Sequence, residues 1–446
     1  MSLTARAVVC GAGIAGVATT YHLVVEEGID DVLVIDPRPP LTLTSDKSTE
    51  CYRNWWPNGP MVGLMNRSID LLQQMAAMSN DAFHLNRRGY LYVTARPETL
   101  SKMTMDGRLA ESLGAGDLRI HNGEGYLPNG PRAPADGADL FGSGPLLRRH
   151  FPFLTDAANG GLHVRRAGWF SAQQLGRWML DRATAEGCHL LRAEVSKVET
   201  TGGRVSRVML SDGTAIQTPV FVNAAGPMLG QVAGLLGIDL PIYSEVHIKV
   251  GFRDHLGVVP RDAPMVIWSD PQRIDWTADE RRLLEEEGRH DLLGEMPAAC
   301  HGRPEGGLDS PWLLALWEYH RIIQEPVWPL PEDPLYPETV MRGMTTMVPG
   351  LARYRDRLPQ PVVDGGYYTK TRENRPLIGP LPIEGAYVIG AFSGFGVMAA
   401  AAAGELIGRH VAEGSLPSYA RAFLPSRYDD PDYVREVATL NETGQI

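Results

Sequence analysis

Three glycines near the N-terminus, Gly11, Gly13 and Gly16, lie between a short apolar run and an apolar-periodic segment. A second apolar run, Val32–Ile35, ends on Asp36, twenty residues after Gly16. In such a pattern the first glycine allows a tight turn, the second lets the backbone approach a pyrophosphate, and the third lets helix and strand pack closely. The segment therefore predicts a β-α-β unit that holds a dinucleotide.

Two further features of this unit support that prediction. The helix that begins at the glycines offers N–H groups and a partial positive charge to phosphates. Asp36 ends the second strand, where its carboxylate can accept hydrogen bonds from ribose hydroxyls. A glycine motif alone is weak evidence, but here strand, helix and distal acid occur in register. A glycine-rich turn that binds nothing is therefore the less favoured interpretation.

The composition bounds the class of protein. The chain has 446 residues, 43% of them hydrophobic and 21% charged, which is typical of a globular protein of two to three domains. Its net charge of −11 disfavours nonspecific binding to nucleic acid. Because no apolar run reaches the roughly 18–20 residues of a membrane span, and only six residues precede the first strand, we expect neither a membrane span nor a signal peptide.

The four cysteines, Cys10, Cys51, Cys188 and Cys300, are scattered and form no CxxC pair. This spacing argues against a disulfide framework and against a structural zinc site, so we expect no metal. It is typical of a reducing compartment, and we therefore expect a cytoplasmic protein.

Apolar spacing predicts a helix over residues 61–78 and another over 171–186, with Ser171 as its N-cap. A charged segment at 277–289 predicts a solvated helix. Glycine-containing turns at 202–203 and 212–213 predict a meander. Its expected strands are 190–198, 204–210 and 215–222.

Several separated segments together resemble one family. They are the glycine unit Gly11–Asp36, the aromatic strand end and helix Gly168–Glu186, the strand end Val222–Gly226, and the long segment Tyr368–Gly396. In this order they are similar to the D-amino-acid oxidase (DAO) family of FAD-dependent amine oxidoreductases, which includes enzymes that oxidise sarcosine, dimethylglycine and glycine. His301–Gly307 also resembles the strand of the family's substrate domain that runs toward the flavin.

The resemblance implies an α/β fold with a Rossmann-like, discontinuous FAD-binding domain of the GR2 type. A mostly antiparallel substrate domain is inserted into it. We assign residues 1–95, 151–240 and 340–446 to the FAD-binding domain, and residues 96–150 and 241–339 to the substrate-binding domain.

The resemblance also implies the residues that contact FAD. Asp36 would bind the ribose, Thr44–Ser48 the pyrophosphate and flavin, and Val195 the adenine through its backbone. A polar surface loop at Thr44–Ser48 and a simple core position at Val195 remain open alternatives. The full expected set is Gly11, Gly13, Ile14, Ala15, Gly16, Asp36, Pro37, Thr44, Ser45, Lys47, Ser48, Thr49, Val195, Ala224, Ala225, Gly226, Gly394, Phe395, Gly396 and Val397.

Two departures from the family pattern affect the prediction. Some members bind flavin through a cysteine just before the position of Tyr368, but here that region reads Gly365-Gly366-Tyr367, so we expect a non-covalent FAD. The family's second carboxylate-binding cation lies just past the last glycine turn, where this chain has Met398.

Arg53 resembles the carboxylate-binding arginine of sarcosine oxidases, and its planar fork suits a carboxylate. A salt-bridged structural arginine is the open alternative. Tyr368, His320 and Tyr319 are expected to lie near the substrate and to tune the protonation of its amine.

We therefore expect an FAD-dependent oxidase or dehydrogenase that oxidises the C–N bond of an amine or amino acid, N-methylated and cyclic secondary amines included, by hydride transfer to flavin N5. A hydroxy-acid dehydrogenase or a monooxygenase is the alternative. The partners are the small-molecule substrate and O2 or another electron acceptor. Many oxidases of the family carry a lysine over the flavin on the strand that here is Trp312–Trp317, which has none, so Lys249 and Lys370 are the remaining candidates.

Overall fold

The computed structural model describes residues 3–130, 132–319, 322–331, 333–355 and 357–440. Within these ranges a six-stranded sheet contains the predicted β-α-β unit. Its neighbouring strands are parallel except for the last, β20, which is antiparallel to β21. In spatial order they are β10 (Cys188–Leu191), β3 (Val32–Ile35), β2 (Ala7–Cys10), β14 (Phe221–Asn223), β21 (Ala386–Gly390) and β20 (Leu377–Pro380). The predicted α/β, Rossmann-like class is confirmed.

Helices cover this sheet. The helix predicted at 171–186 begins after its expected cap Ser171, and the one predicted at 61–78 begins two residues earlier than predicted. In α2 (Gly59–Met78) the side chain of Asn58 accepts a hydrogen bond from the N–H of Met61, and in α5 (Ala172–Ala185) Ser171 accepts from Gln174. The α1 helix (Ile14–Tyr21) packs against α5 and against α9 (Gly396–Val411), and α9 also contacts α2. Small side chains allow this close packing, because residues 399–403 of α9 are five consecutive buried alanines.

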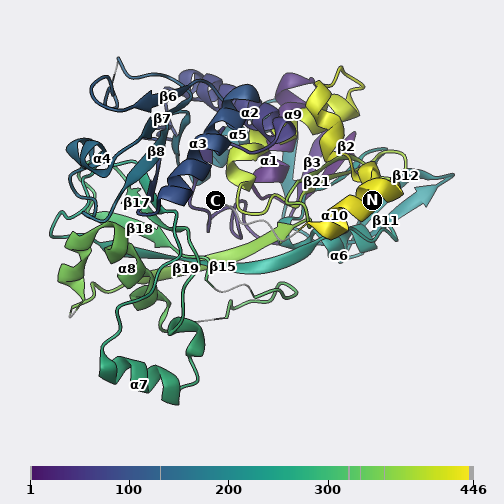
Figure 1. The fold of residues 1–446 in the computed structure, drawn as a ribbon. Coiled ribbons are helices and arrows are strands. Elements are labelled where there is room, and N and C mark those ends of the chain that lie inside the picture. Colours follow the sequence, from purple (N-terminus) through teal and green to yellow (C-terminus); the bar gives the residue numbers. More distant parts are fainter. Residues whose placement is uncertain (1–2, 131, 320–321, 332, 356, 441–446) are drawn as a thin grey trace.

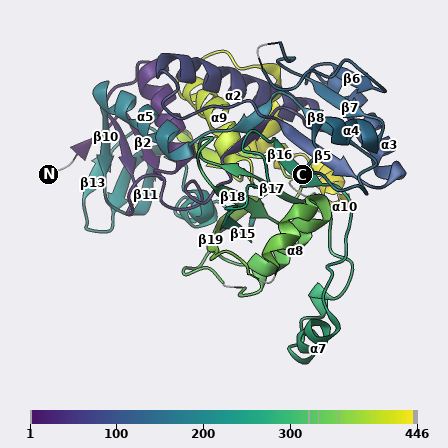
Figure 2. The ribbon, with the colours of Figure 1, turned by 90° about the vertical axis from the view of Figure 1, so that its left-hand side faces the viewer.

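A second, nine-stranded sheet lies beside these helices (Figures 1 and 2). It is antiparallel apart from two parallel pairs, β16 with β5 and β6 with β7. Its spatial order is β19 (Val362–Lys370), β15 (Tyr243–Arg253), β18 (Trp312–Leu316), β17 (Cys300–Glu305), β16 (Met265–Trp268), β5 (Tyr90–Thr94), β8 (Gly160–Val164), β7 (Ala138–Phe141) and β6 (Leu118–His121). Three of these strands, β5, β8 and β19, fall in ranges that we assigned to the FAD-binding domain, and the division into two domains stays a prediction.

The longest pairing in that sheet joins β15 to β19, and both strands are prominent in Figure 1. The pairing runs from Tyr243 opposite Lys370 to Gly251 opposite Val362. It sets Glu245 opposite Tyr368, and this register is important for the site.

The predicted meander is only partly correct. The hairpin from β11 (Val195–Thr201) to β12 (Arg204–Leu210) and the turn at 212–213 are present. The expected strand 190–198 is instead two strands, since β10 joins the six-stranded sheet and β11 a four-stranded one. The expected strand 215–222 likewise divides into β13 (Ala215–Gln217) and β14. Apolar alternation shows that a segment is extended but not where it leaves one sheet for another.

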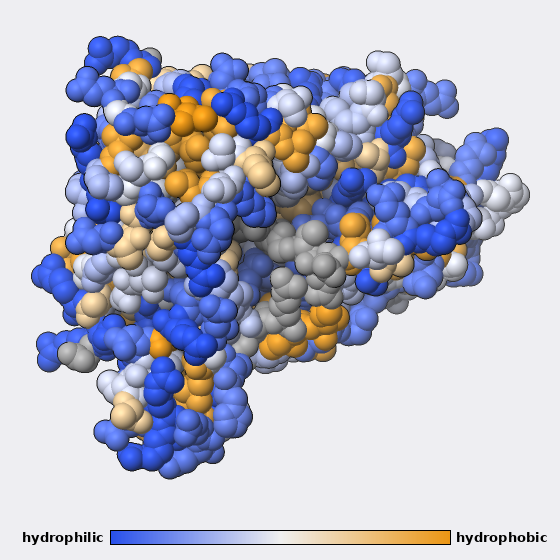
Figure 3. Space-filling view, viewed as in Figure 1, coloured by the Kyte–Doolittle hydropathy of each residue, from blue (hydrophilic) through white to orange (hydrophobic). Residues whose placement is uncertain are grey.

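The charged helix predicted at 277–289 is α7 (Ala278–Glu286), which stands away from the sheets in Figures 1 and 2 and is mostly hydrophilic in Figure 3. A capping box between Thr277 and Glu280 begins it.

None of the helices in the described ranges is both long and apolar enough to cross a bilayer. The remaining elements are β1 (Leu3–Thr4), the π-helical turn His22–Glu26, β4 (Cys51–Arg53), α3 (Pro97–Ser112), α4 (Gly144–His150), β9 (Ala167–Trp169), α6 (Leu229–Gly234), α8 (Tyr336–Met347), α10 (Pro431–Thr439) and 3-10 turns at 226–228, 290–292, 349–354, 418–423 and 425–429.

Candidate active site

A cavity of about 930 Å³ lies at the carboxyl ends of β2, β3, β14 and β21. This is the edge at which open parallel sheets bind ligands. The cavity collects most of the expected FAD contacts, namely Gly11, Gly13, Ile14, Ala15, Asp36, Thr44, Ser45, Ser48, Ala224, Ala225, Gly226, Gly394, Gly396 and Val397.

The first glycine turn has the geometry that its sequence predicts. Gly11 has φ +111°, and a Cβ there would lie 2.4 Å from the carbonyl oxygen of Ala224. A Cβ on Gly16 would lie 1.9 Å from the carbonyl oxygen of Gly11. The Asp36 carboxylate accepts a hydrogen bond from the N–H of Ala12 at 2.9 Å, so the acid is held beside the turn and lines the cavity.

A second turn borders the same cavity from β21 into α9. Ala391 and Ser393 have φ of +55° and +53°, and the N–H of Ser393 donates to the carbonyl of Thr369. The N-cap residues Phe395 of α9 and Gly13 of α1 supply no capping side chain, and Ser45 Oγ accepts a hydrogen bond from the N–H of Ile14 at the start of α1. Both helix N-termini border the cavity, and such ends favour phosphates and electron-rich groups. The residues present thus fit a flavin dinucleotide.

Several expected contacts do not line this cavity. Gly16 packs α1 against the first turn, Val195 is buried in an apolar cluster, and Lys47 forms an ion pair with Asp364 at 3.1 Å. Pro37 is also outside the lining. Lining residues that our prediction missed are Arg38, Pro39, Leu41, Thr42, Leu43, Pro227, Tyr367, Thr369 and residues 389–393.

A second pocket of about 420 Å³ adjoins the first, since Tyr368 and Gly394 line both. Apolar and aromatic side chains dominate its wall, together with one arginine, one carboxylate and one histidine. The lining is Thr49, Cys51, Arg53, Trp56, Tyr90, Met265, His301, Leu316, Glu318, Tyr368, Gly394, Phe395 and Met398.

Arg53, at the end of β4, is 7% exposed and belongs to this second pocket. The carbon of its guanidinium lies 4.5 Å from the ring centroid of Trp56 and 5.7 Å from that of Tyr90. Its Nε donates to the carbonyl of Trp55 at 3.3 Å. The aromatic rings against the faces of the planar guanidinium group thus fix its orientation.

The other expected substrate-site residues behave differently from one another. Tyr368 lines both cavities, and burial raises the pKa of its hydroxyl, which therefore stays protonated. Tyr319 lines neither, because its hydroxyl donates to Asp333 at 3.2 Å and its ring stacks on Tyr336. His320 lies outside the described residues.

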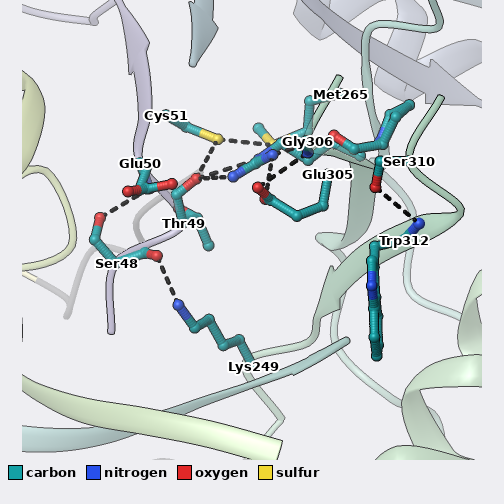
Figure 4. Close-up of polar contacts among 12 residues, drawn as sticks. Ser48, Thr49, Glu50, Cys51, Lys249, Met265, Glu305, Gly306, Ser310 and Trp312 are labelled. Carbon is teal, nitrogen blue, oxygen red and sulfur yellow. Dashed lines mark hydrogen bonds and ion pairs between the residues drawn. The ribbon is translucent and has the colours of Figure 1, made fainter. Parts of the chain in front are cut away.

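The loop between the two cavities is held by two cations, and Figure 4 shows this contact region. Lys249 donates to the carbonyl of Ser48 at 2.8 Å, and Arg303 donates to that of Thr49 at 2.6 Å. The Cys51 thiol donates to the same Thr49 carbonyl, and burial raises its pKa. Neither Lys249 nor Lys370 lines either cavity among the described residues.

A chain of buried charges runs behind the second pocket. Glu318 lies 3.3 Å from Nδ1 of His247, whose Nε2 lies 3.2 Å from Oε2 of Glu245, and Lys370 forms an ion pair with that same oxygen. The ring of His247 stacks on Tyr368 with centroids 3.7 Å apart. The sequence analysis did not predict this row of buried charges. The signal that was available is the alternation of Glu245, His247 and Lys249 along one strand, which puts all three on one face.

His301 on β17 was expected only as part of a strand toward the flavin, yet it lines the second pocket. Its Nδ1 lies 2.7 Å from the carbonyl oxygen of Ala299. A carbonyl only accepts hydrogen bonds, so this nitrogen carries the proton and Nε2 is the acceptor. Burial lowers the pKa of His301, which keeps the imidazole neutral.

The comparisons with known proteins agree with this geometry. The family described as FAD dependent oxidoreductase (DAO) matches residues 6–409, and the chain belongs to it. The protein is therefore an FAD-dependent oxidoreductase. No curated protein matches the chain by sequence.

Solved structures share the fold at low sequence identity. L-proline dehydrogenase from P. horikoshii superimposes with a TM-score of 0.76 at 19% identity, over 96% of this chain and 99% of that one. Glycine oxidase from Geobacillus kaustophilus gives 0.74 at 14% identity, again over 96% and 99%. Iminodiacetate oxidase from Chelativorans sp. BNC1 gives 0.69 at 18% identity, over 94% and 99%. The similarity extends over nearly the full length of all three.

Proposed function

We propose that this oxidoreductase oxidises the C–N bond of an amino-acid-like amine, N-methylated and cyclic secondary amines included. The observation that carries the proposal is the pocket beside the cofactor cavity, in which the guanidinium of Arg53 is held by aromatic faces. The similar structures named for proline, glycine and iminodiacetate turnover support the same class of substrate.

Bound FAD would supply the acceptor for the hydride, which carries both electrons of the oxidation. Arg53 would bind the substrate carboxylate through two N–H groups. The neutral His301 would take a proton from the substrate ammonium at Nε2, because only the uncharged amine can give up a hydride. Apolar wall residues such as Leu316, Phe395 and Met398 would exclude water and position the Cα–H bond.

The FAD is proposed to be non-covalent. Cys51 is the cysteine that lines the second pocket, but its buried thiol has a raised pKa and is a poor nucleophile. Acid precipitation should therefore release all of the flavin into the supernatant. All four cysteines are buried and free, which supports a reducing compartment such as the cytoplasm.

An anaerobic titration tests the function. Purified protein is mixed with glycine, N-methylglycine, L-proline and iminodiacetate, with lactate and glycolate as matched hydroxy acids, and flavin absorbance near about 450 nm is followed. Bleaching by an amine but by none of the hydroxy acids is expected. Bleaching by hydroxy acids alone would contradict the proposal, and NADPH oxidation would indicate a monooxygenase. The rate of reoxidation in air, compared with a dye, distinguishes O2 from another acceptor.

A further inference from the structure

Glu318 is the carboxylate that lines the second pocket, and it follows directly after β18. Its side chain is 18% exposed, and it also lines a neighbouring cavity together with His247. Oε1 faces Nδ1 of His247 at 3.3 Å. A carboxylate with one oxygen tied to a partner can still accept further hydrogen bonds at the pocket.

The residues behind Glu318 hold it ionised. Both ring nitrogens of His247 face carboxylates, which only accept hydrogen bonds, so the ring carries two protons and a positive charge. Burial opposes this charge, but Glu318 and Glu245 together raise the pKa of His247. Burial would also raise the pKa of Glu318, yet His247 and Lys370 lower it.

Burying such a row of charged side chains costs free energy of desolvation. Apolar side chains in the same place would stabilise the sheet as well or better. Here the chain of charges ends at the wall of the pocket that also holds Arg53. Both of these charged residues act on His301 electrostatically, since Arg53 lowers the pKa of His301 and Glu318 raises it. The pocket therefore presents one cation and one anion to whatever it binds, with His301 within reach of the field of each.

Resting on the proposed amine oxidation, we propose that Glu318 binds the protonated amine of the substrate, which enters as a zwitterion with its carboxylate at Arg53. One ammonium proton then moves to Nε2 of His301, which leaves a neutral amine and an imidazolium. The remaining N–H donates to Glu318. His247, Glu245 and Lys370 are positioning residues, because none of them lines the second pocket.

Matched pairs of ligands test this assignment. In each pair an ether oxygen replaces the amine: methoxyacetate for N-methylglycine, tetrahydro-2-furoate for L-proline, and diglycolate for iminodiacetate. Affinity for the amines is taken from the saturation of the anaerobic flavin reduction rate, and affinity for the ethers from the perturbation of flavin absorbance. The ratio of the two affinities isolates the contribution of the charged amine.

Glu318→Gln should weaken binding of the amine about 10- to 100-fold and leave the ether unchanged or tighter. The exposed Glu287→Gln is the matched control and should leave both affinities unchanged. Glu318→Asp keeps the charge and should retain part of the preference. Equal weakening of both ligands by Glu318→Gln, or of neither, would overturn the assignment and indicate a purely structural chain.

A second variant keeps the assignment testable if the Glu318→Gln protein does not retain its flavin. Glu245→Gln breaks the chain behind Glu318 and should lower the preference for the amine in the same direction; an unchanged preference would overturn the assignment. If a wild-type preparation is bleached by an amine but the ratio is insensitive to these variants, only this inference fails. If no amine in the panel bleaches the wild type, the proposed function fails and the inference with it.

Discussion

Arg53 illustrates how a single residue type carries a functional prediction. A guanidinium that packs its faces on Trp56 and Tyr90 directs its N–H groups sideways, in the plane of the fork. The pocket beside it has the uncharged Met398 where the family resemblance implies a second cation, so the binding of an acidic substrate would depend strongly on Arg53.

Replacing Arg53 by Met should raise KM for an acidic substrate about 10- to 100-fold, because a charge-assisted, bidentate contact is lost. Arg53→Lys keeps the charge but not the fork and should recover only part of this loss. Steady-state kinetics with an amino acid and with the corresponding carboxylate-free amine provide the measurement. A KM that stays the same for both variants would remove Arg53 from the site.

The pKa of His301 should determine how the rate of flavin reduction falls at acid pH. Burial and the Arg53 charge lower its pKa below the usual 6.5, while the Glu318 carboxylate raises it in part. A base must be unprotonated, so the rate of flavin reduction should fall only below about pH 6.5. Glu318→Gln removes the negative charge that raises the pKa of His301. The acid fall in the rate should therefore move to lower pH. A fall that moves to higher pH in Glu318→Gln would contradict this role for His301.

At the scale of elements, the first glycine turn depends on contact between α1 and the loop after β2. A side chain at Gly16 would overlap the carbonyl of Gly11, and the helix would have to move away from the sheet. This is a constraint on packing as well as on the binding of the cofactor.

Gly16→Ala should therefore destabilise the protein by about 1–3 kcal/mol, as overpacking does. Gly234, in α6, is the matched control because a Cβ there meets no atom within 4 Å. Gly234→Ala should be neutral or stabilising by up to about 1 kcal/mol. Urea unfolding of both variants measures the difference. The same midpoint in the two variants would show that the contact at Gly16 relaxes without cost.

At the scale of the whole molecule, the cofactor cavity joins the two large sheets. Gly11 and Asp36 directly follow β2 and β3 of the six-stranded sheet, and Tyr367 and Tyr368 lie in β19 of the nine-stranded one. A ligand in this cavity would contact both, so its binding should stabilise the entire fold.

Apoprotein should accordingly gain stability on addition of FAD, by about 2.7 kcal/mol at a ligand concentration of 100 Kd. Thermal unfolding with increasing FAD measures the gain as a rise in Tm. Riboflavin lacks the pyrophosphate that the helix N-termini would bind and should give a clearly smaller rise. Equal effects of riboflavin and FAD would argue against phosphate binding at the first glycine turn.

Local signals account for the parts that were predicted correctly. The glycine turn, the Ser171 cap and the hairpin at 202–203 each involve residues close in sequence, where backbone geometry strongly restricts residue type. The break between β10 and β11 was missed because which sheet a strand joins depends on distant partners. Tyr319 remains a prediction for the site, although its hydroxyl is directed to Asp333.

The amino-acid sequence by itself determined the dinucleotide turn, the α/β class and the candidate carboxylate-binding arginine. Only the tertiary structure decided that Glu318 and His301 line one pocket and that His247 lies behind it against Glu318. The physical reason is that turn and cap geometry is governed by a few neighbouring residues, whereas the ionisation of a buried carboxylate depends on which charges the sheet brings within a few ångströms of it.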